Sequence, residues 1–286
     1  MTIEGFTPSS NGIPIAARHF ATMHDSTSLL GDSEALRNRY QQDGYLLLRG
    51  VLDSEPIWRL REQYFSLFPA TYFQAGTSPG AGIYSGHYPD DLLPYGVKGH
   101  PAHRFVRGQA FTAFTSQPQL ASLAADLLGR PASLVPRKVL RHFDQASKLA
   151  SRAHIDRSYP SGGDDMVTVW IPIGECPVAT GSLVYLSGSH RVAKSALTGA
   201  DATTDRLHDR RAYSNDLGWT ASRLGGKWLW TDFQAGDIAV HGPDLVHASL
   251  DTTTAVMRLS ADIRFQRADA PVRPGWAQAW AADDGE

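Results

Sequence analysis

The sequence contains a single cysteine, Cys176, among its 286 residues. One cysteine cannot form an internal disulfide, and it cannot supply a metal site built from several thiolates. No lysine, arginine or histidine stands beside Cys176 in the chain to activate its thiol. We therefore interpret Cys176 as a small packed residue and not as a nucleophile.

A strong charge of one sign and a long hydrophobic run are also missing. Lysine plus arginine number 27 and aspartate plus glutamate 29, a formal net charge of −2. This balance gives no basic field for a polyanion, so we expect no nucleic-acid partner. No run approaches the roughly 18 apolar residues of a membrane span. Residues 1–10 also lack the features of a signal peptide. We expect a cytoplasmic protein without a membrane partner.

Helical patterns are concentrated in the first half of the chain. One helix is predicted over 32–40, a second starting near Asp53 or Ser54, and a third over 116–129, where Gly and Pro end it. The apolar run 45–48 predicts a buried strand.

Strand patterns dominate from about residue 130. The β-forming segments are 133–140, 166–173, 182–186, 237–241 and 256–266. Helices first and strands afterwards, without βαβ alternation, argue against a parallel doubly wound sheet. They favour a mainly β fold, an antiparallel sandwich or barrel with flanking helices.

The motif His154-Ile155-Asp156 is the first indication of chemistry. In an extended strand, His154 and Asp156 point to the same side and can occupy adjacent corners of one metal ion. A distant second histidine would complete a two-histidine, one-carboxylate triad, which holds Fe(II) on one face. The motif alone is weak, because His142 and Asp144 form another His-x-Asp.

The order of the downstream motifs is more specific. A β-forming run containing Trp170 follows the His-x-Asp, then come a Gly-x-Leu strand ending in the turn 188–190, the pair Gly236-Asp237, and the triplet 247–249. Arg258 follows His247 by 258 − 247 = 11 positions. This ordered set, together with an opening strand at 42–52, resembles the phytanoyl-CoA dioxygenase family of Fe(II)- and 2-oxoglutarate-dependent oxygenases. The resemblance covers about residues 36–266.

The resemblance implies a double-stranded β-helix, or jelly-roll, core. We expect one domain over 1–286, with a helical part at about 30–130 and the core at about 131–268. The implied cofactor is Fe(II), with 2-oxoglutarate and O2 as cosubstrates. The implied reaction is hydroxylation, or another oxidation, of an unactivated C–H bond of a small-molecule metabolite or natural-product intermediate.

The resemblance assigns the metal to His154, Asp156 and His247. The interval to the tryptophan strand, 170 − 154 = 16, fits the family, whereas 170 − 142 = 28 does not. Because Asp156 is present where halogenating relatives carry a small residue, halogenation is disfavoured.

Two other histidines compete less well. His241 is not followed by Ala-Ser, and position 252, eleven residues later, is threonine and not arginine. His190 lies in the Gly-Ser-His turn, where a hydrogen bond that fixes the loop is the simpler interpretation.

The same resemblance assigns cosubstrate residues. A guanidinium offers two parallel N–H donors to the 5-carboxylate of 2-oxoglutarate, which favours Arg258. Arg264 lies on the same face of the predicted strand and stays open. Ser249 is a second candidate for that carboxylate, and Trp170 is either close to the cosubstrate or a core residue.

Several points stay open. The family's polar residue on an earlier strand is Arg107, Arg137 or Lys138. The segments 70–101 and 194–227 are candidate lids over the substrate. The alternatives are a cupin-like metal-dependent non-redox enzyme and a catalytically silent binding sandwich. The first is disfavoured because the chain has no His-x-His.

Overall fold

A large antiparallel sheet forms one wall of the molecule in the computed structural model, which describes residues 7–147, 150–158, 166–192 and 212–280. Its hydrogen-bonded order is β4-β10-β7-β12-β5, and β6 pairs with another part of β12. The strands are β4 (Tyr45–Leu48), β5 (Ala132–Leu134), β6 (Val139–Phe143), β7 (Met166–Pro172), β10 (Ile238–His241) and β12 (Arg258–Arg267).

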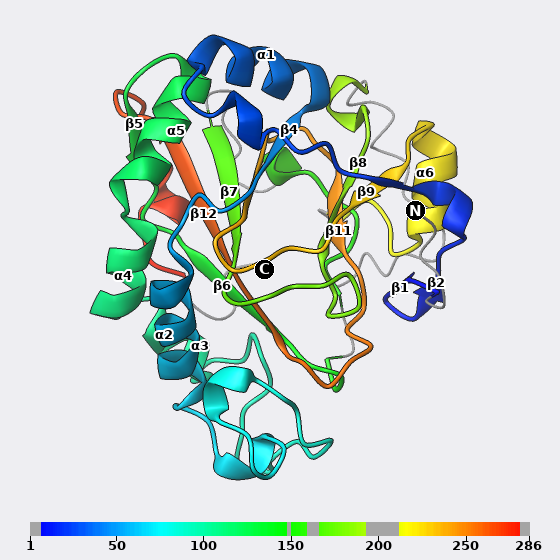
Figure 1. Ribbon diagram of the computed structural model, residues 1–286, viewed down its shortest axis with the longest axis vertical. Coiled ribbons are helices and arrows are strands. Elements are labelled where there is room, and N and C mark those ends of the chain that lie inside the picture. Colours follow the sequence, from blue (N-terminus) through cyan, green and yellow to red (C-terminus); the bar gives the residue numbers. More distant parts are fainter. Residues whose placement is uncertain (1–6, 148–149, 159–165, 193–211, 281–286) are drawn as a thin grey trace.

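A smaller sheet of order β11-β8-β9-β3 faces the large one (Figure 1). Its strands are β3 (Phe20–Thr22), β8 (Leu183–Leu186), β9 (Trp228–Trp230) and β11 (His247–Ser249), and a short hairpin joins β1 (Ser9–Ser10) to β2 (Ile13–Pro14). The two sheets do not close into one barrel. The prediction of a mainly β fold with flanking helices and a jelly-roll core is confirmed.

Helices cover the outer face of the large sheet (Figure 1). They are α1 (Ser33–Asp43), α2 (Ser54–Phe65), α3 (Pro101–Phe105), α4 (Gln109–Thr115) and α5 (Pro118–Leu128), while α6 (Leu217–Leu224) lies beside the small sheet. The Asp32 carboxylate caps α1 by accepting from the backbone N–H groups of Glu34 and Ala35. Among the described residues, no helix combines the length and apolar character that a bilayer crossing requires.

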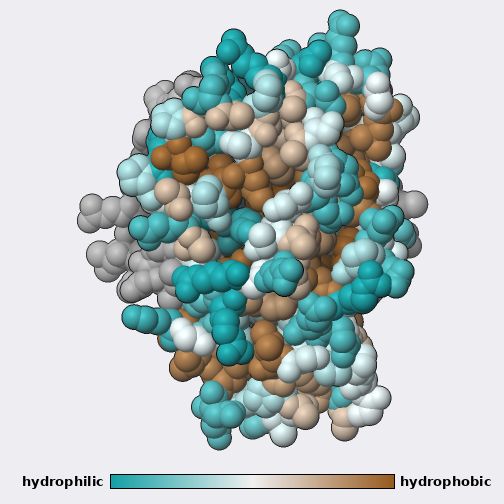
Figure 2. Space-filling view, turned by 90° about the vertical axis from the view of Figure 1, so that its left-hand side faces the viewer, coloured by the Kyte–Doolittle hydropathy of each residue, from teal (hydrophilic) through white to brown (hydrophobic). Residues whose placement is uncertain are grey.

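The strands β4, β7 and β10 of the large sheet are buried on both faces. On β4, Leu46 and Leu48 pack on the helical side, whereas Tyr45 and Leu47 pack between the two sheets. This explains why the segment is a continuous apolar run without alternation. On the helical face, hydrophobic and hydrophilic side chains are mixed at the surface (Figure 2).

β12 is the strand that brings polar groups between the sheets. Leu259, Ala261, Ile263 and Phe265 belong to the helical-side core. The alternate residues are polar and equally buried: Arg258, Ser260, Asp262 and Arg264. Because successive side chains point to opposite faces, these polar residues point into the space between the sheets.

Some elements were not predicted from the sequence. The expected strand at 133–140 is two strands, β5 and β6, separated by a segment that contains Pro136, which has no N–H for ladder pairing. The short strands β3, β9 and β11 and the short helices α3, α4 and α6 carry too little periodicity to be read.

Candidate metal centre

The three predicted metal ligands lie together between the sheets. His154 and Asp156 are on the short segment that leads into a 3-10 turn, and His247 is the first residue of β11. One ligand atom from each lies within 4.8 Å of the others, and all three side chains are buried. The imidazole centroids of His154 and His247 are 4.1 Å apart.

Backbone carbonyls orient both imidazoles. Nδ1 of His154 lies 2.6 Å from the carbonyl oxygen of Arg152, and Nδ1 of His247 lies 3.0 Å from that of Leu245. A carbonyl oxygen can only accept, so Nδ1 of each ring carries the proton. The lone pair therefore resides on Nε2, which is the arrangement that metal-binding histidines use.

The carboxylate of Asp156 is held by both oxygens. Oδ2 accepts from the hydroxyl of Thr168 on β7. Oδ1 lies 3.8 Å from Nε2 of His247 and accepts from Nη2 of Arg264 at 3.3 Å. Oδ1 is thus the oxygen that faces the distal histidine.

The protonation states suit metal binding. Burial raises the pKa of Asp156, but the positive charge of Arg264 and the nearby imidazoles outweigh it, so its pKa lies well below the usual range. Burial lowers the pKa of His154, and burial together with the neighbouring imidazoles lowers that of His247 well below its ordinary value. An ionised carboxylate and two neutral imidazoles are the forms that bind a cation, so these residues fit Fe(II).

A second group of predicted residues gathers around Arg258. Its Nη1 donates to the Ser249 hydroxyl at 2.8 Å and to the carbonyl of Gly181. Its guanidinium carbon lies 5.4 Å from the ring centroid of Trp170. Arg258, Ser249 and Trp170 come from three strands and line one region between the sheets.

This region is arranged to accept an anion. Arg258 is 1% exposed and its burial lowers its pKa, while Asp262, whose charge raises that pKa, is ion-paired with Arg141. The Nε1–H of Trp170 is buried and has no hydrogen-bond partner among the described residues. A buried cation that forms no direct ion pair and a buried N–H without an acceptor are both costly. A carboxylate would satisfy both groups, so the residues fit 2-oxoglutarate.

Arg264, the alternative to Arg258, occupies a different place on the same face of β12. Its guanidinium contacts Asp156 and lies 4.3 Å from the ring centroid of Trp276. The guanidinium of Arg137 lies 5.7 Å from the same ring. Arg264 therefore contacts a predicted metal ligand, whereas Arg258 contacts the other predicted cosubstrate residues.

Two of the earlier-strand candidates lie on the helical side. Arg107 donates to the backbone carbonyl of Trp280, a residue of the helical-side core, and Lys138 donates to the hydroxyl of Thr112 on α4. Neither contact is in the space between the sheets.

Arg141, which was not among the candidates predicted from the sequence, lies near Arg258. It lies on β6 opposite Ser260 of β12, and its Nε donates to Oδ2 of Asp262 at 2.7 Å. The next residue but one, Phe143, lies against the guanidinium of Arg258. The segment 139–143 shows no apolar–polar alternation, so the sequence offers no signal for the direction of Arg141.

The structure describes all of the first predicted lid and only part of the second. In the first, at 70–101, the hydroxyl of Tyr72 donates to Asp144, and the backbone of Tyr84 donates to Ala255 just before β12. In the second, at 194–227, residues 194–211 lie outside the described residues. Its described part pairs Ser214 with Ala153, next to the first predicted ligand.

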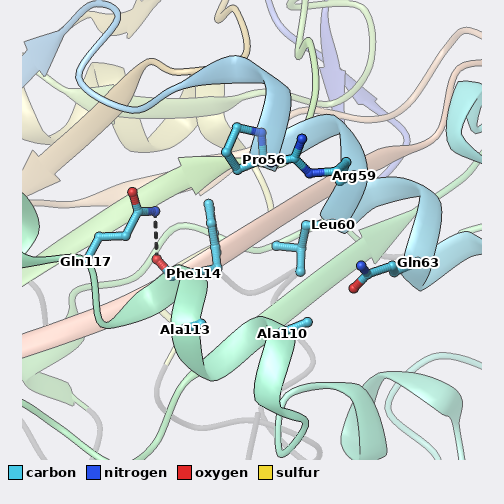
Figure 3. Close-up of a pocket in the computed structure, with 8 residues that line it drawn as sticks. All are labelled: Pro56, Arg59, Leu60, Gln63, Ala110, Ala113, Phe114 and Gln117. Carbon is cyan, nitrogen blue, oxygen red and sulfur yellow. Dashed lines mark hydrogen bonds between the residues drawn. The ribbon is translucent and has the colours of Figure 1, made fainter.

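A shallow groove lies elsewhere, between α2 and α4 (Figure 3). It is lined by Pro56, Arg59, Leu60, Gln63, Ala110, Ala113, Phe114 and Gln117. Its one charged residue, Arg59, is ion-paired with Glu55, and its lining includes no histidine or carboxylate. The metal-ligand chemistry is therefore between the sheets and not in this groove.

Comparison with known proteins places these residues in a family. The family model of phytanoyl-CoA dioxygenase matches residues 40–260. The chain is 25% identical to a 1-deoxypentalenic acid 11-beta-hydroxylase of Streptomyces arenae over 262 residues, which cover 88% of this chain and 87% of that protein.

Solved structures show the same fold at lower identity. The epimerase SnoN from nogalamycin biosynthesis is 21% identical, with a TM-score of 0.58 over 85% of each chain. The carbocyclase SnoK from the same biosynthesis is 21% identical, with a TM-score of 0.58 over 88% of this chain and 90% of that chain. The predicted resemblance is confirmed: the chain belongs to the phytanoyl-CoA dioxygenase family.

Proposed function

We propose that this protein is an Fe(II)- and 2-oxoglutarate-dependent oxygenase that hydroxylates, or otherwise oxidises, an unactivated C–H bond of a small molecule. The observation that carries the proposal is the meeting of His154, Asp156 and His247. Their ligand atoms lie within 4.8 Å of one another, and both imidazoles have Nδ1 tied to a backbone carbonyl. Family membership supports the same reaction class.

The chain's own groups have distinct tasks in this proposal. His154 and His247 would hold Fe(II) through Nε2, and Asp156 would hold it through a carboxylate oxygen. Arg258 and Ser249 would bind the 5-carboxylate of 2-oxoglutarate, with Trp170 alongside and Arg141 as a further cation. When bound, the iron and its cosubstrate supply the activation of O2. The protein positions the reactants and excludes water, since the surrounding side chains are buried.

A natural-product intermediate is the substrate class that we propose. A curated relative at 25% identity is a hydroxylase named for 1-deoxypentalenic acid. The segments 70–101 and 194–227 would form the substrate lids. We further propose a single domain, with its helical part at about 30–130 and its core at about 131–268. The partner would be a small molecule and not nucleic acid or a membrane, and the location would be the cytoplasm.

Anaerobic titration tests the proposal directly. Fe(II) followed by 2-oxoglutarate should give a weak visible charge-transfer band, because the cosubstrate chelates the metal. A cupin-like non-redox enzyme and a silent binding sandwich both predict no such band. The band should be lost in His154→Ala. A folded wild-type protein that binds Fe(II) without producing the band would contradict the proposed function. If the band is present, screening candidate metabolites for stimulated succinate formation would identify the substrate.

A further inference from the structure

A third histidine lies beside the candidate metal centre without belonging to it. His241 is the last residue of β10 and is 1% exposed. Its ring centroid is 4.4 Å from that of His247. Its Nε2 lies 3.4 Å from Oδ2 of Asp156 and makes no hydrogen bond among the described residues. His241 is therefore aimed at the carboxylate, although its ligand atoms are not in the cluster of three.

A tyrosine hydroxyl lies on the other side of the imidazole. The hydroxyl of Tyr185 on β8 lies 2.9 Å from Nδ1 of His241. If the hydroxyl donates to Nδ1, the neutral ring carries its proton on Nε2. That proton faces Oδ2 of Asp156, which is ionised and can only accept. Tyr185, His241 and Asp156 thus lie in a row, in which the hydroxyl of Tyr185 is hydrogen-bonded to the ring and Nε2 is 3.4 Å from the carboxylate.

Strand pairing brings a second donor to the same oxygen. His241 on β10 is the direct partner of Thr168 on β7, and the Thr168 hydroxyl also donates to Oδ2 of Asp156. Oδ2 is therefore flanked by two groups from neighbouring strands. Oδ1 remains on the side of His247, at 3.8 Å from its Nε2, and accepts from Nη2 of Arg264 at 3.3 Å.

We propose that His241 is a positioning residue for the metal centre. Held by Tyr185, it acts with Thr168 to fix Oδ2 of Asp156, so that the carboxylate presents only Oδ1 to the metal. The inference rests on the proposed function, because it concerns how a proposed ligand is held. Outer groups that orient ligating side chains typically contribute 10- to 100-fold to metal affinity, and about this factor is expected here.

A packing role alone would predict something different. A buried histidine that only fills space needs one partner, and Tyr185 already supplies it. A packing role would also be met by any ring of similar size at position 241. The two interpretations therefore separate when the ring is kept and its donor is removed.

Co(II) binding to the purified protein, without 2-oxoglutarate, is the test. His241→Phe keeps a ring and removes both nitrogens, so the dissociation constant for Co(II) should rise about 10- to 100-fold. His241→Gln keeps an N–H donor near the position of Nε2 and should recover most of the affinity. Thr168→Val should weaken binding, whereas Thr168→Ser should not. The Co(II) absorption bands should change in the weakened variants, because the carboxylate is free to bind through both oxygens.

Tyr45→Phe is the matched control. Tyr45 packs on Tyr185 at 5.2 Å between ring centroids, but its hydroxyl accepts from the backbone of His24 and not from the metal centre. This variant should bind Co(II) as the wild type does. If His241→Phe does not fold, the Thr168 pair and Tyr185→Phe give the same comparison.

Two results would overturn the inference. The first is a folded His241→Phe, or Thr168→Val, whose Co(II) affinity and spectrum equal those of the wild type. The second is an X-ray absorption spectrum with three imidazole ligands in the wild type, because His241 would then be a ligand itself. Failure of the proposed function looks different: the wild type would not bind Co(II) and would not differ from His154→Ala, or it would bind Fe(II) without giving the charge-transfer band with 2-oxoglutarate.

Discussion

His154 and His247, two of the proposed metal ligands, are hydrogen-bonded to each other through their main chains. The N–H of His154 donates to the carbonyl of His247 at 3.0 Å, and the N–H of His247 donates to that of His154 at 2.9 Å. This reciprocal pair connects residues that are 247 − 154 = 93 positions apart. The spacing of the two imidazoles is therefore set by backbone hydrogen bonds, which are less adaptable than side-chain contacts.

Removing His154 should abolish Fe(II) binding at this centre. His154→Ala deletes one of three proposed ligands, and the two remaining ones cannot hold the ion on one face. Iron content per protein after anaerobic loading and desalting should fall to background. Circular dichroism should show the wild-type fold. Undiminished iron content in a folded variant would refute the ligand assignment.

Arg258→Ala should weaken 2-oxoglutarate binding about 10- to 100-fold while sparing metal affinity, since a hydrogen bond to a charged group is worth about 1.5–3 kcal/mol. Arg258→Lys should recover little, because an ammonium cannot donate two parallel N–H bonds. Calorimetry with the metal-loaded protein measures the affinity. Unchanged cosubstrate affinity in Arg258→Ala would transfer the role to Arg264 or Arg141.

An ion pair also connects the two chain segments that carry the proposed metal ligands. Arg157, next to Asp156, donates from Nε and Nη2 to the two carboxylate oxygens of Asp244, three residues before His247. Asp244→Asn removes the charge and one acceptor, so metal affinity should fall by up to about tenfold. Asp269→Asn is the control, because Asp269 pairs with Arg267 at the exposed surface. Equal effects of both substitutions on metal affinity would argue against a role of the Arg157–Asp244 ion pair in metal binding.

Acid should destabilise the protein partly through His142, which lies outside the metal centre. Burial and the charge of Arg61 lower its pKa to about 3 in the folded state, so the unfolded chain binds this proton first as the pH falls below about 6.5. Stability is therefore lost on acidification. Between pH 7 and pH 5 the loss from this group is about 2 kcal/mol. Urea unfolding of His142→Phe should show a smaller difference between these two pH values, and an equal difference would contradict the prediction.

The local patterns of the sequence sufficed for the longer elements and for the residues that indicated the family. Asp32 and Gly44 bound the first helix because capping and left-handed backbone are local properties. The intervals between His154, Trp170, His247 and Arg258 indicated the family, because each residue lies on or next to a strand whose pattern is short-range.

Tertiary structure decided which cations face the space between the sheets. Arg107, Lys138 and Arg141 are equivalent in sequence terms, yet only strand pairing shows Arg141 beside Asp262 and the other two against the helical layer. His241 was a rival ligand in the sequence, and its register against Thr168 places it behind the carboxylate of Asp156. The physical reason is that the side a residue faces depends on its pairing partners, and these are far away along the chain.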